Sequence, residues 1–174
     1  IGPGGICITR MVAGVGVPQF SAIQSCAAVS QKAHIPLIAD GGTNYPGDMT
    51  KALAAGASTV MITGWLAGTD ESPGGIILRK GQKYKVHRGA ASLTAVASRY
   101  IDIALEEIVP EGVESFVPYK GPVKDVIHQL VGAVKSGMSY CNAKNISQLW
   151  KHAQFMQITT AGFRESTQHN VEEM

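Results

Sequence analysis

Two short apolar runs, each leading into glycine, constrain the fold of this 174-residue chain more than any other feature. Residues 35–39 run directly into an Asp-Gly-Gly turn, and residues 59–63 run into Gly64. Between the two runs, apolar side chains recur with helical spacing up to Gly56, where a left-handed helix cap is expected. This order predicts a β-α-β unit with two parallel strands, buried on both faces and joined by a right-handed crossover. The expected fold class is therefore α/β.

Helix and turn signals divide the rest of the chain. The glycine-rich residues 1–17 are expected to form a shaped loop, and Pro18 opens a helix predicted over residues 18–33. Residues 93–108 permit a helix but mix their apolar positions, so much of this stretch is expected to be mobile. Four further elements are predicted: a hairpin of 76–79 and 83–87, a helix from Pro122 to near Gly137, a helix capped by Asn145 with Gln148, and a strand at 155–159.

Charge and composition exclude several classes of partner. Lysine plus arginine number 15 and aspartate plus glutamate 13, an excess too small to favour nucleic acid or an anionic membrane. No apolar run approaches the ~20 residues that cross a bilayer, and no signal segment opens the chain, so a cytoplasmic protein is expected. The three cysteines have no C-x-x-C spacing and are expected to be free thiols. The start at Ile1, inside a glycine-rich loop, indicates a piece of a longer chain.

The hairpin is basic because it carries Arg79, Lys80, Lys83, Lys85 and Arg88. Its second arm alternates these lysines with apolar residues, which predicts that the charges form a solvated face without chemistry of their own. The five histidines show no metal-ligand spacing. The patterns GPGG and GVGV lack the strand, helix and acidic residue of a dinucleotide fingerprint.

Cys7 is the first candidate for chemistry. It lies in the glycine-rich loop, where backbone amides can lower the pKa of a thiol by stabilising its anion. Thr9 stands two residues later, so in an extended loop both side chains point to the same side and the hydroxyl can relay a proton. The alternative is a buried, inert cysteine.

The ends of the two predicted strands form the second candidate. Asp40, Gly41 and Gly42 would place a carboxylate and bare backbone amides at the carboxyl edge of a parallel sheet, and Thr63-Gly64 ends the next strand similarly. A carboxylate there can bind a sugar diol, and converging amides can bind a phosphate. These features suggest a nucleotide or sugar phosphate, with Asp40 as a simple turn cap as the alternative.

Seven segments in this order carry a resemblance to a known family: IGPGGICITR, GVGVPQ, IADGG, ALAAGAS, LAGTDESPG, YKVHRG and VPEG. From residue 1 to about 168 the chain resembles the IMP dehydrogenase / GMP reductase family. The resemblance implies a (β/α)8 TIM barrel about twice this length. Residues 1–174 would then supply roughly the carboxyl-terminal half of one catalytic barrel domain, with about residues 74–120 as a hairpin and mobile flap.

The resemblance also implies a reaction through a covalent intermediate. Cys7 matches the nucleophile that attacks carbon 2 of the purine, a hydride then leaves for NAD, and water cleaves the adduct. Arg99 and Tyr100 match the flap pair that activates this water, and Thr9 with Glu111 matches a second proton relay. The positions that match substrate-binding residues are Gly5, Asp40, Gly41, Gly42, Thr63, Gly64, His87, Gly89 and Ala90.

A potassium ion and a homotetramer are further implications of the resemblance. The ion would be held by backbone carbonyls matched by Gly2, Gly4 and Cys7, and by the tail of a neighbouring subunit. Glu165, Ser166 and Thr167 stand where that tail is expected.

Several positions depart from the family pattern. Gly5 replaces a serine, Thr63-Gly64 replaces a Gly-Ser pair, and His87 replaces a tyrosine, so three hydroxyl donors to the substrate phosphate are missing or shifted. Thr63 and a protonated His87 are the candidates to replace them. Ala90-Ala91 replaces the usual methionine-glycine of the turn that faces the base.

Three functions remain open from the sequence. Arg99-Tyr100 and the tail AGFRES favour an NAD-dependent IMP dehydrogenase of purine and GMP biosynthesis. The short stretch from Ser92 to Glu111 favours GMP reductase, which converts GMP and NADPH to IMP and ammonia, although Ile108 replaces an arginine of the reductase pattern. The degraded phosphate positions favour a catalytically inactive nucleotide-binding homologue.

Overall fold

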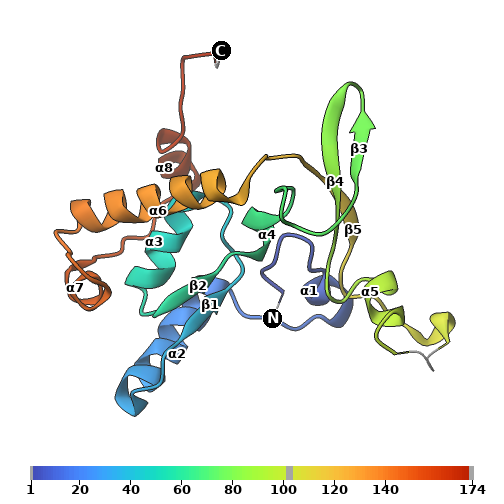
Figure 1. Cartoon of the computed structure of the whole chain (residues 1–174). Helices are drawn as coiled ribbons and strands as arrows, with labels where there is room; N and C mark the ends of the chain where they lie inside the picture. Colours follow the sequence, from blue (N-terminus) through green and yellow to red (C-terminus); the bar gives the residue numbers. More distant parts are fainter. Residues whose placement is uncertain (1, 101–103, 173–174) are drawn as a thin grey trace.

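The first half of the chain is a β-α-β unit (Figure 1). The computed structural model describes residues 2–100 and 104–172. Helix α2 (Gln19–Ala33) leads to strand β1 (Ile38–Asp40), and helix α3 (Pro46–Ala54) connects β1 to strand β2 (Thr59–Met61). The strands pair in parallel, with each end of β1 opposite the same end of β2. The predicted α/β class and parallel pairing are thus confirmed.

Both strands are shorter and more exposed than predicted. The N–H of Ile35 donates to the carbonyl of Ser30 and closes α2, so β1 begins three residues later than expected. Ile38 on β1 is 56% exposed and Met61 on β2 is 42% exposed. The prediction of strands buried on both faces is therefore wrong for this chain, because each strand has one paired neighbour in the described ranges.

A three-stranded antiparallel sheet follows, made of β3 (Ile76–Arg79), β4 (Gln82–Arg88) and β5 (Glu114–Pro118). The hairpin β3–β4 confirms its prediction and extends away from the α/β unit in Figure 1. Lys80 and Gly81 form its turn with positive φ angles of 49° and 79°, the geometry of a tight hairpin. Strand β5 was not predicted, and it pairs with β4 across a long connection that includes α5 (Leu93–Ala97) and the 3-10 turn η1 (Leu105–Glu107).

Lys85 contradicts the expected solvated face of the hairpin. Its side chain is buried, with 4% exposed, whereas Val86 is 37% exposed. The Lys85 ammonium donates to the carbonyls of Thr69, Asp70 and Ser72, which belong to the turn after α4 (Thr63–Leu66). The alternation is reversed at this point because backbone carbonyls replace the water that would otherwise solvate the charge.

Two helices cover α3 from outside the β-α-β unit. Helix α6 (Val123–Tyr140) and helix α7 (Ile146–His152) follow β5, and the Asn145 side chain accepts from the N–H of Gln148 as predicted. Leu53 of α3 is buried in one cluster with Ala143 and Leu149. Both predicted helices are confirmed, and α6 runs three residues beyond Gly137.

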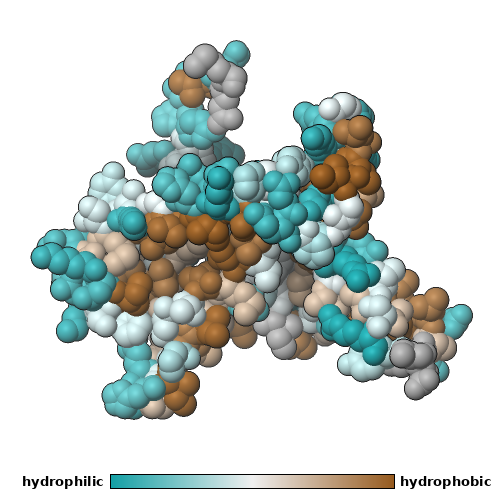
Figure 2. Space-filling model, viewed as in Figure 1, coloured by the Kyte–Doolittle hydropathy of each residue, from teal (hydrophilic) through white to brown (hydrophobic). Residues whose placement is uncertain are grey.

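The termini differ from their predictions. Helix α1 (Thr9–Ala13) lies within the expected loop of residues 1–17, and helix α8 (Thr160–Glu165) follows residues 155–159 and was not predicted. Residues 155–159 are not a strand, because they pair with no other segment among the described residues. Within the same ranges, no helix is long and apolar enough to span a membrane. Figure 2 shows apolar surface over the hairpin and beside α6. Exposed apolar residues of these elements include Ile76, Leu78, Ile127 and Val131.

Candidate active site

The loop that carries Cys7 is fixed by pairing with a distant segment. The N–H of Ile8 donates to the carbonyl of Glu111 at 2.9 Å, and the N–H of Val113 donates to the carbonyl of Ile6 at 2.9 Å. Cys7 and Gly112 thus form an isolated antiparallel bridge. The N–H of Cys7 itself donates to the carbonyl of Gly4 at 3.0 Å. The segment before β5 therefore determines where the thiol lies.

The Cys7 thiol is partly exposed and its environment favours the anion. The Sγ atom lies 3.2 Å from Oγ1 of Thr9. Hydrogen bonds from the Thr9 hydroxyl, then from the backbone of Thr9 and of Gly2, lower the pKa of Cys7, while burial and the charge of Glu111 oppose this. The inert-cysteine alternative does not fit a thiol that is accessible and hydrogen-bonded in this way.

Two adjoining cavities open beside this loop. The larger, of about 570 Å³, contains Cys7 and Glu111, with further walls from Ile6, His87, Arg88, Gly89, Ala90, Ala91, Gly112 and Val117. The smaller, of about 300 Å³, is lined by Pro3, Gly41, Gly42, Thr43, Asn44, Met61, Trp65 and Lys120. Gly4, Gly5, Thr63 and Gly64 line both. A single elongated ligand can thus extend from the thiol to the ends of β1 and β2.

Glycine is required where the turn after β1 meets the Cys7 loop. Gly41 has a φ of 87°, and a Cβ there would lie 2.8 Å from the Pro3 ring and 3.2 Å from the backbone nitrogen of Gly4. The N–H of Gly42 donates to the carbonyl of Pro3 at 3.1 Å. A side chain at position 41 would therefore separate the sheet edge from the Cys7 loop.

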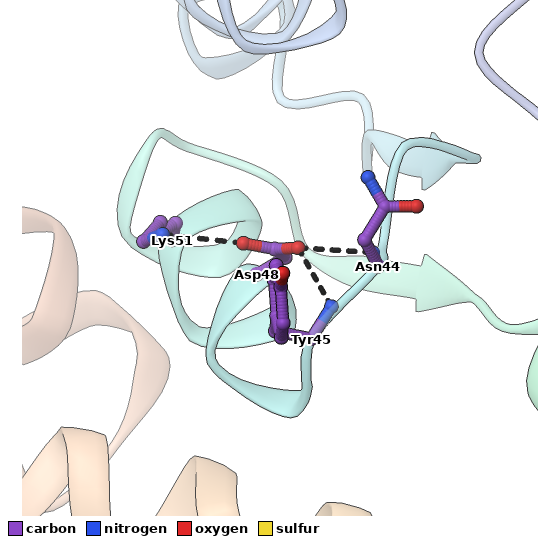
Figure 3. A network of polar contacts seen from close by, with 4 residues as sticks. All are labelled: Asn44, Tyr45, Asp48 and Lys51. Atoms are coloured by element: carbon purple, nitrogen blue, oxygen red, sulfur yellow. Dashed lines mark hydrogen bonds and ion pairs between the residues drawn. The ribbon is translucent and has the colours of Figure 1, made fainter. Parts of the chain in front are cut away.

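The next turn is shaped by the start of α3 (Figure 3). The Asp48 carboxylate accepts from the backbone N–H groups of Asn44 and Tyr45 at 2.9 Å each, and its other oxygen lies 3.2 Å from the Lys51 ammonium. A carboxylate in the first turn satisfies the free amides of a helix start. This capping fixes the backbone that leads from Thr43 and Asn44, two wall residues of the smaller cavity, into α3.

Two basic groups stand close to the junction of the cavities. Burial lowers the pKa of Lys120. Burial and then the charge of Lys120 lower the pKa of His87. The imidazole of His87 is therefore biased towards its neutral form, which disfavours the predicted protonated His87.

A known family matches nearly the whole chain. The sequence model of the "IMP dehydrogenase / GMP reductase domain" matches residues 1–169. The chain belongs to the IMP dehydrogenase / GMP reductase family. It is 53% identical over 178 residues to an inosine-5'-monophosphate dehydrogenase of Helicobacter pylori, covering 99% of this chain and 37% of that protein. It is 49% identical over 176 residues to that of Bacillus subtilis, covering 99% of this chain and 36% of that protein.

A solved structure of the same family shares the fold. GMP reductase C318A of Trypanosoma brucei, in complex with guanosine 5'-monophosphate, superposes with a TM-score of 0.92 and is 48% identical. The match covers 99% of this chain and 36% of that one. The chain thus spans little more than a third of the length of these family members.

The structure gathers most of the residues that the family resemblance predicts. Cys7 and Glu111 line the larger cavity with six of the predicted substrate-binding residues, and the predicted glycines of both strand ends line the smaller. Thr9 reaches the site through its contact with Cys7. Four wall residues of the smaller cavity were not predicted from the sequence: Lys120, Trp65, Thr43 and Asn44. Lys120 gave no signal because β5, which it follows, was itself not predicted.

Other predicted residues lie apart from the two cavities. Asp40 is not among their described lining residues, and its exposed backbone carbonyl accepts from Gln19 at 2.8 Å. Arg99 and Tyr100 follow α5, with the backbone N–H of each donating to the carbonyl of Val96, and they do not line either cavity in the described ranges. Residues 165–167 end α8, distant from the Cys7 loop in Figure 1.

Proposed function

We propose that the protein containing this chain oxidises IMP to XMP with NAD, through a covalent bond between Cys7 and carbon 2 of the purine. The observation that carries the proposal is the accessible Cys7 thiol, with its lowered pKa, on a cavity that continues into a glycine-lined hollow. The inosine-5'-monophosphate dehydrogenases of Helicobacter pylori and Bacillus subtilis support it at 53% and 49% identity.

Cys7 provides the first and the last step of the proposed reaction. Its thiolate forms a bond to carbon 2 of IMP, and the hydride expelled from that carbon reduces NAD. Water then adds to the same carbon, the carbon–sulfur bond breaks, and the thiol is regained with XMP as product. The Thr9 hydroxyl stabilises the thiolate on which both steps depend.

Glu111 and Arg99 would carry out the proton transfers that accompany these steps. Glu111 lines the cavity beside Cys7, so its carboxylate can exchange a proton with the purine edge. Arg99 is proposed to activate the water, with Tyr100 beside it. Because both lie outside the cavities in this structure, this role requires the segment after α5 to approach the site, as the flaps of other enzymes do.

The residues present fit the implied potassium ion and NAD in part. The Cys7 loop offers carbonyl oxygens, the type of ligand that potassium ions take, and the Gly4 carbonyl already accepts one N–H. The cavity of about 570 Å³ has the size of a ligand site. Its walls beside Cys7 would hold the nicotinamide of NAD, which would supply the hydride acceptor.

A (β/α)8 barrel is proposed for the complete domain. The parallel strands β1 and β2 would supply two neighbouring strands, and Ile38 of β1, which is exposed here, would be covered by the remaining strands of the barrel. A cytoplasmic homotetramer, with residues 165–167 reaching a neighbour's Cys7 loop, is proposed with it.

GMP reductase is the second candidate, favoured by the Trypanosoma brucei GMP reductase at 48% identity and a TM-score of 0.92. The same thiolate would attack carbon 2 of GMP and ammonia would leave. A hydride from NADPH would then add to carbon 2, the carbon–sulfur bond would break, and IMP and the thiolate would be released. Both reactions use the same Cys7 chemistry.

The deciding experiment supplies the full-length protein with IMP plus NAD, or with GMP plus NADPH. Nicotinamide absorbance reports turnover, and intact mass spectrometry reports a purine adduct on Cys7. Formation of XMP with a transient adduct supports the dehydrogenase. Turnover with GMP alone would reassign the protein as a reductase, and no turnover with either pair would favour the inactive nucleotide-binding homologue.

A further inference from the structure

The smaller cavity has one ionisable side chain in its described walls. That residue is Lys120, and the rest of the lining consists of glycines, Pro3, Met61, Trp65 and uncharged polar residues. A cavity with amide and hydroxyl walls and a single ammonium group has the composition of an anion site. In the described walls, no carboxylate competes for the ammonium.

The backbone of Lys120 is held from both sides. Its N–H donates to the carbonyl of Gly68 at 2.9 Å, and the carbonyl of Gly121 accepts from the N–H of Asp70 at 2.9 Å. The hydroxyl of Tyr119 donates to the Asp70 carboxylate at 2.6 Å. These hydrogen bonds from the turn after α4 hold the backbone at the end of β5, so the position of Lys120 is fixed.

The ammonium group is only partly satisfied. It donates to the carbonyl of Trp65 at 2.9 Å and lies 3.5 Å from the carbonyl of Gly64 and 6.0 Å from the centre of the Trp65 ring. An ammonium has three N–H donors, and these carbonyls carry no full charge. Burial lowers the pKa of Lys120 because it removes water from the cation without supplying an anion.

We propose that Lys120 binds the phosphate of the nucleotide and is the residue by which this site selects a monophosphate over a nucleoside. The inference rests on the proposed function and adds a residue to it. The described walls of the smaller cavity offer the hydroxyls of Thr43 and Thr63, and Lys120 adds the one full positive charge among them. His87 is a poor substitute, since its environment favours the neutral imidazole.

The test measures binding without turnover. Isothermal titration calorimetry on the full-length protein would give dissociation constants for IMP, inosine and inorganic phosphate, with Lys120→Gln as the variant and Lys124→Gln as the control. Lys124 is exposed on α6, four residues away. A charge-assisted hydrogen bond corresponds to an affinity loss of about 10- to 100-fold. In Lys120→Gln the dissociation constants for IMP and phosphate should rise by this factor, and the dissociation constant for inosine should stay unchanged.

Structural damage has a different signature. A substitution that merely releases the Trp65 carbonyl would weaken the binding of IMP and of inosine alike. Lys120→Arg keeps the charge and should retain most of the IMP affinity. Equal loss for IMP and inosine, or an unchanged affinity for IMP, would overturn the proposal. If neither purine nucleotide is turned over but phosphate binding still depends on Lys120, the proposed function fails while the anion site stands.

Discussion

The Sγ atom of Cys7 lies 3.2 Å from the Oγ1 atom of Thr9, two residues along the same loop. This contact is the largest cause of the lowered pKa of the Cys7 thiol. The hydroxyl can donate to the thiolate but gains less from the neutral thiol, so the pair favours ionisation.

Replacing Thr9 by valine should raise the pKa of Cys7, because the shape is kept and the main donor is lost. The rate of alkylation by iodoacetamide against pH measures this pKa in a Cys26→Ser, Cys141→Ser background. The midpoint should move to higher pH in Thr9→Val, while Thr9→Ser should stay close to the parent. Coinciding profiles for all three proteins would mean that the hydroxyl does not stabilise the thiolate.

Arg99 should act after hydride transfer. In Arg99→Gln, the water that cleaves the Cys7 adduct would lack its activating group, so hydrolysis should slow by about 100-fold or more and the adduct should accumulate. Rapid-quench mass spectrometry of Cys7 measures it. Arg79→Gln, on the exposed hairpin, is the control. Equal slowing of hydride transfer and hydrolysis in Arg99→Gln would rule out a role in activating water.

Gly137 is required by the packing of α6 on α3. A Cβ at this position would lie 2.5 Å from Cγ2 of Thr50, so the two helices touch through the glycine. Gly137→Ala should lower the free energy of unfolding by about 1–2 kcal/mol despite its better helix propensity. In a Thr50→Ala background the same change should cost about 1 kcal/mol less, because Cγ2 and Oγ1 of Thr50 are removed and only its Cβ, 3.1 Å from the added methyl, remains. Urea unfolding of the four proteins provides the cycle, and additive effects would contradict the contact.

Lys85 should contribute to stability through its buried ammonium. Lys85→Met removes the ammonium donor from the carbonyls of Thr69, Asp70 and Ser72 and should lower the free energy of unfolding by about 2–4 kcal/mol. Lys83→Met is the matched control on the same strand, since Lys83 is exposed and lies 5.5 Å from the Tyr119 ring. Lys83→Met should lower the free energy of unfolding by less than about 1 kcal/mol. Similar losses for both variants would mean that burial of Lys85 has no special role.

His87 should make the protein less stable in mild acid. Its pKa is lowered in the folded state, first by burial and then by Lys120, so the unfolded chain binds more protons as the pH falls through its ordinary value near 6.5. Stability should therefore rise with pH across this range. His87→Gln should reduce this slope in urea unfolding between about pH 5.5 and 8. An unchanged slope would assign the pH dependence to other groups.

Local signals sufficed for elements whose cause is local. The cap of α7 was predictable from Asn145 and Gln148, because the hydrogen bond that starts the helix joins residues three apart. The hairpin was predictable since Lys80-Gly81-Gln82 lies between its two arms. The turn at Gly41 and Gly42 was also predictable, because the positive φ angle that both adopt is a property of one residue and its nearest neighbours, and both line the smaller cavity.

Contacts between segments far apart in the sequence determined the features that were not predicted. Strand β5 exists because β4 pairs with it after a connection of 25 residues between Arg88 and Glu114. Residues 155–159 have no pairing partner in the described part of the chain and therefore form no strand. Lys85 is buried because a turn from another part of the chain offers its carbonyls. The sequence alone predicted the β-α-β order, the two helices after it and Cys7 as the candidate nucleophile. Only the tertiary structure determined which charges meet at the cavities, because electrostatics depends on distances that no spacing along the chain encodes.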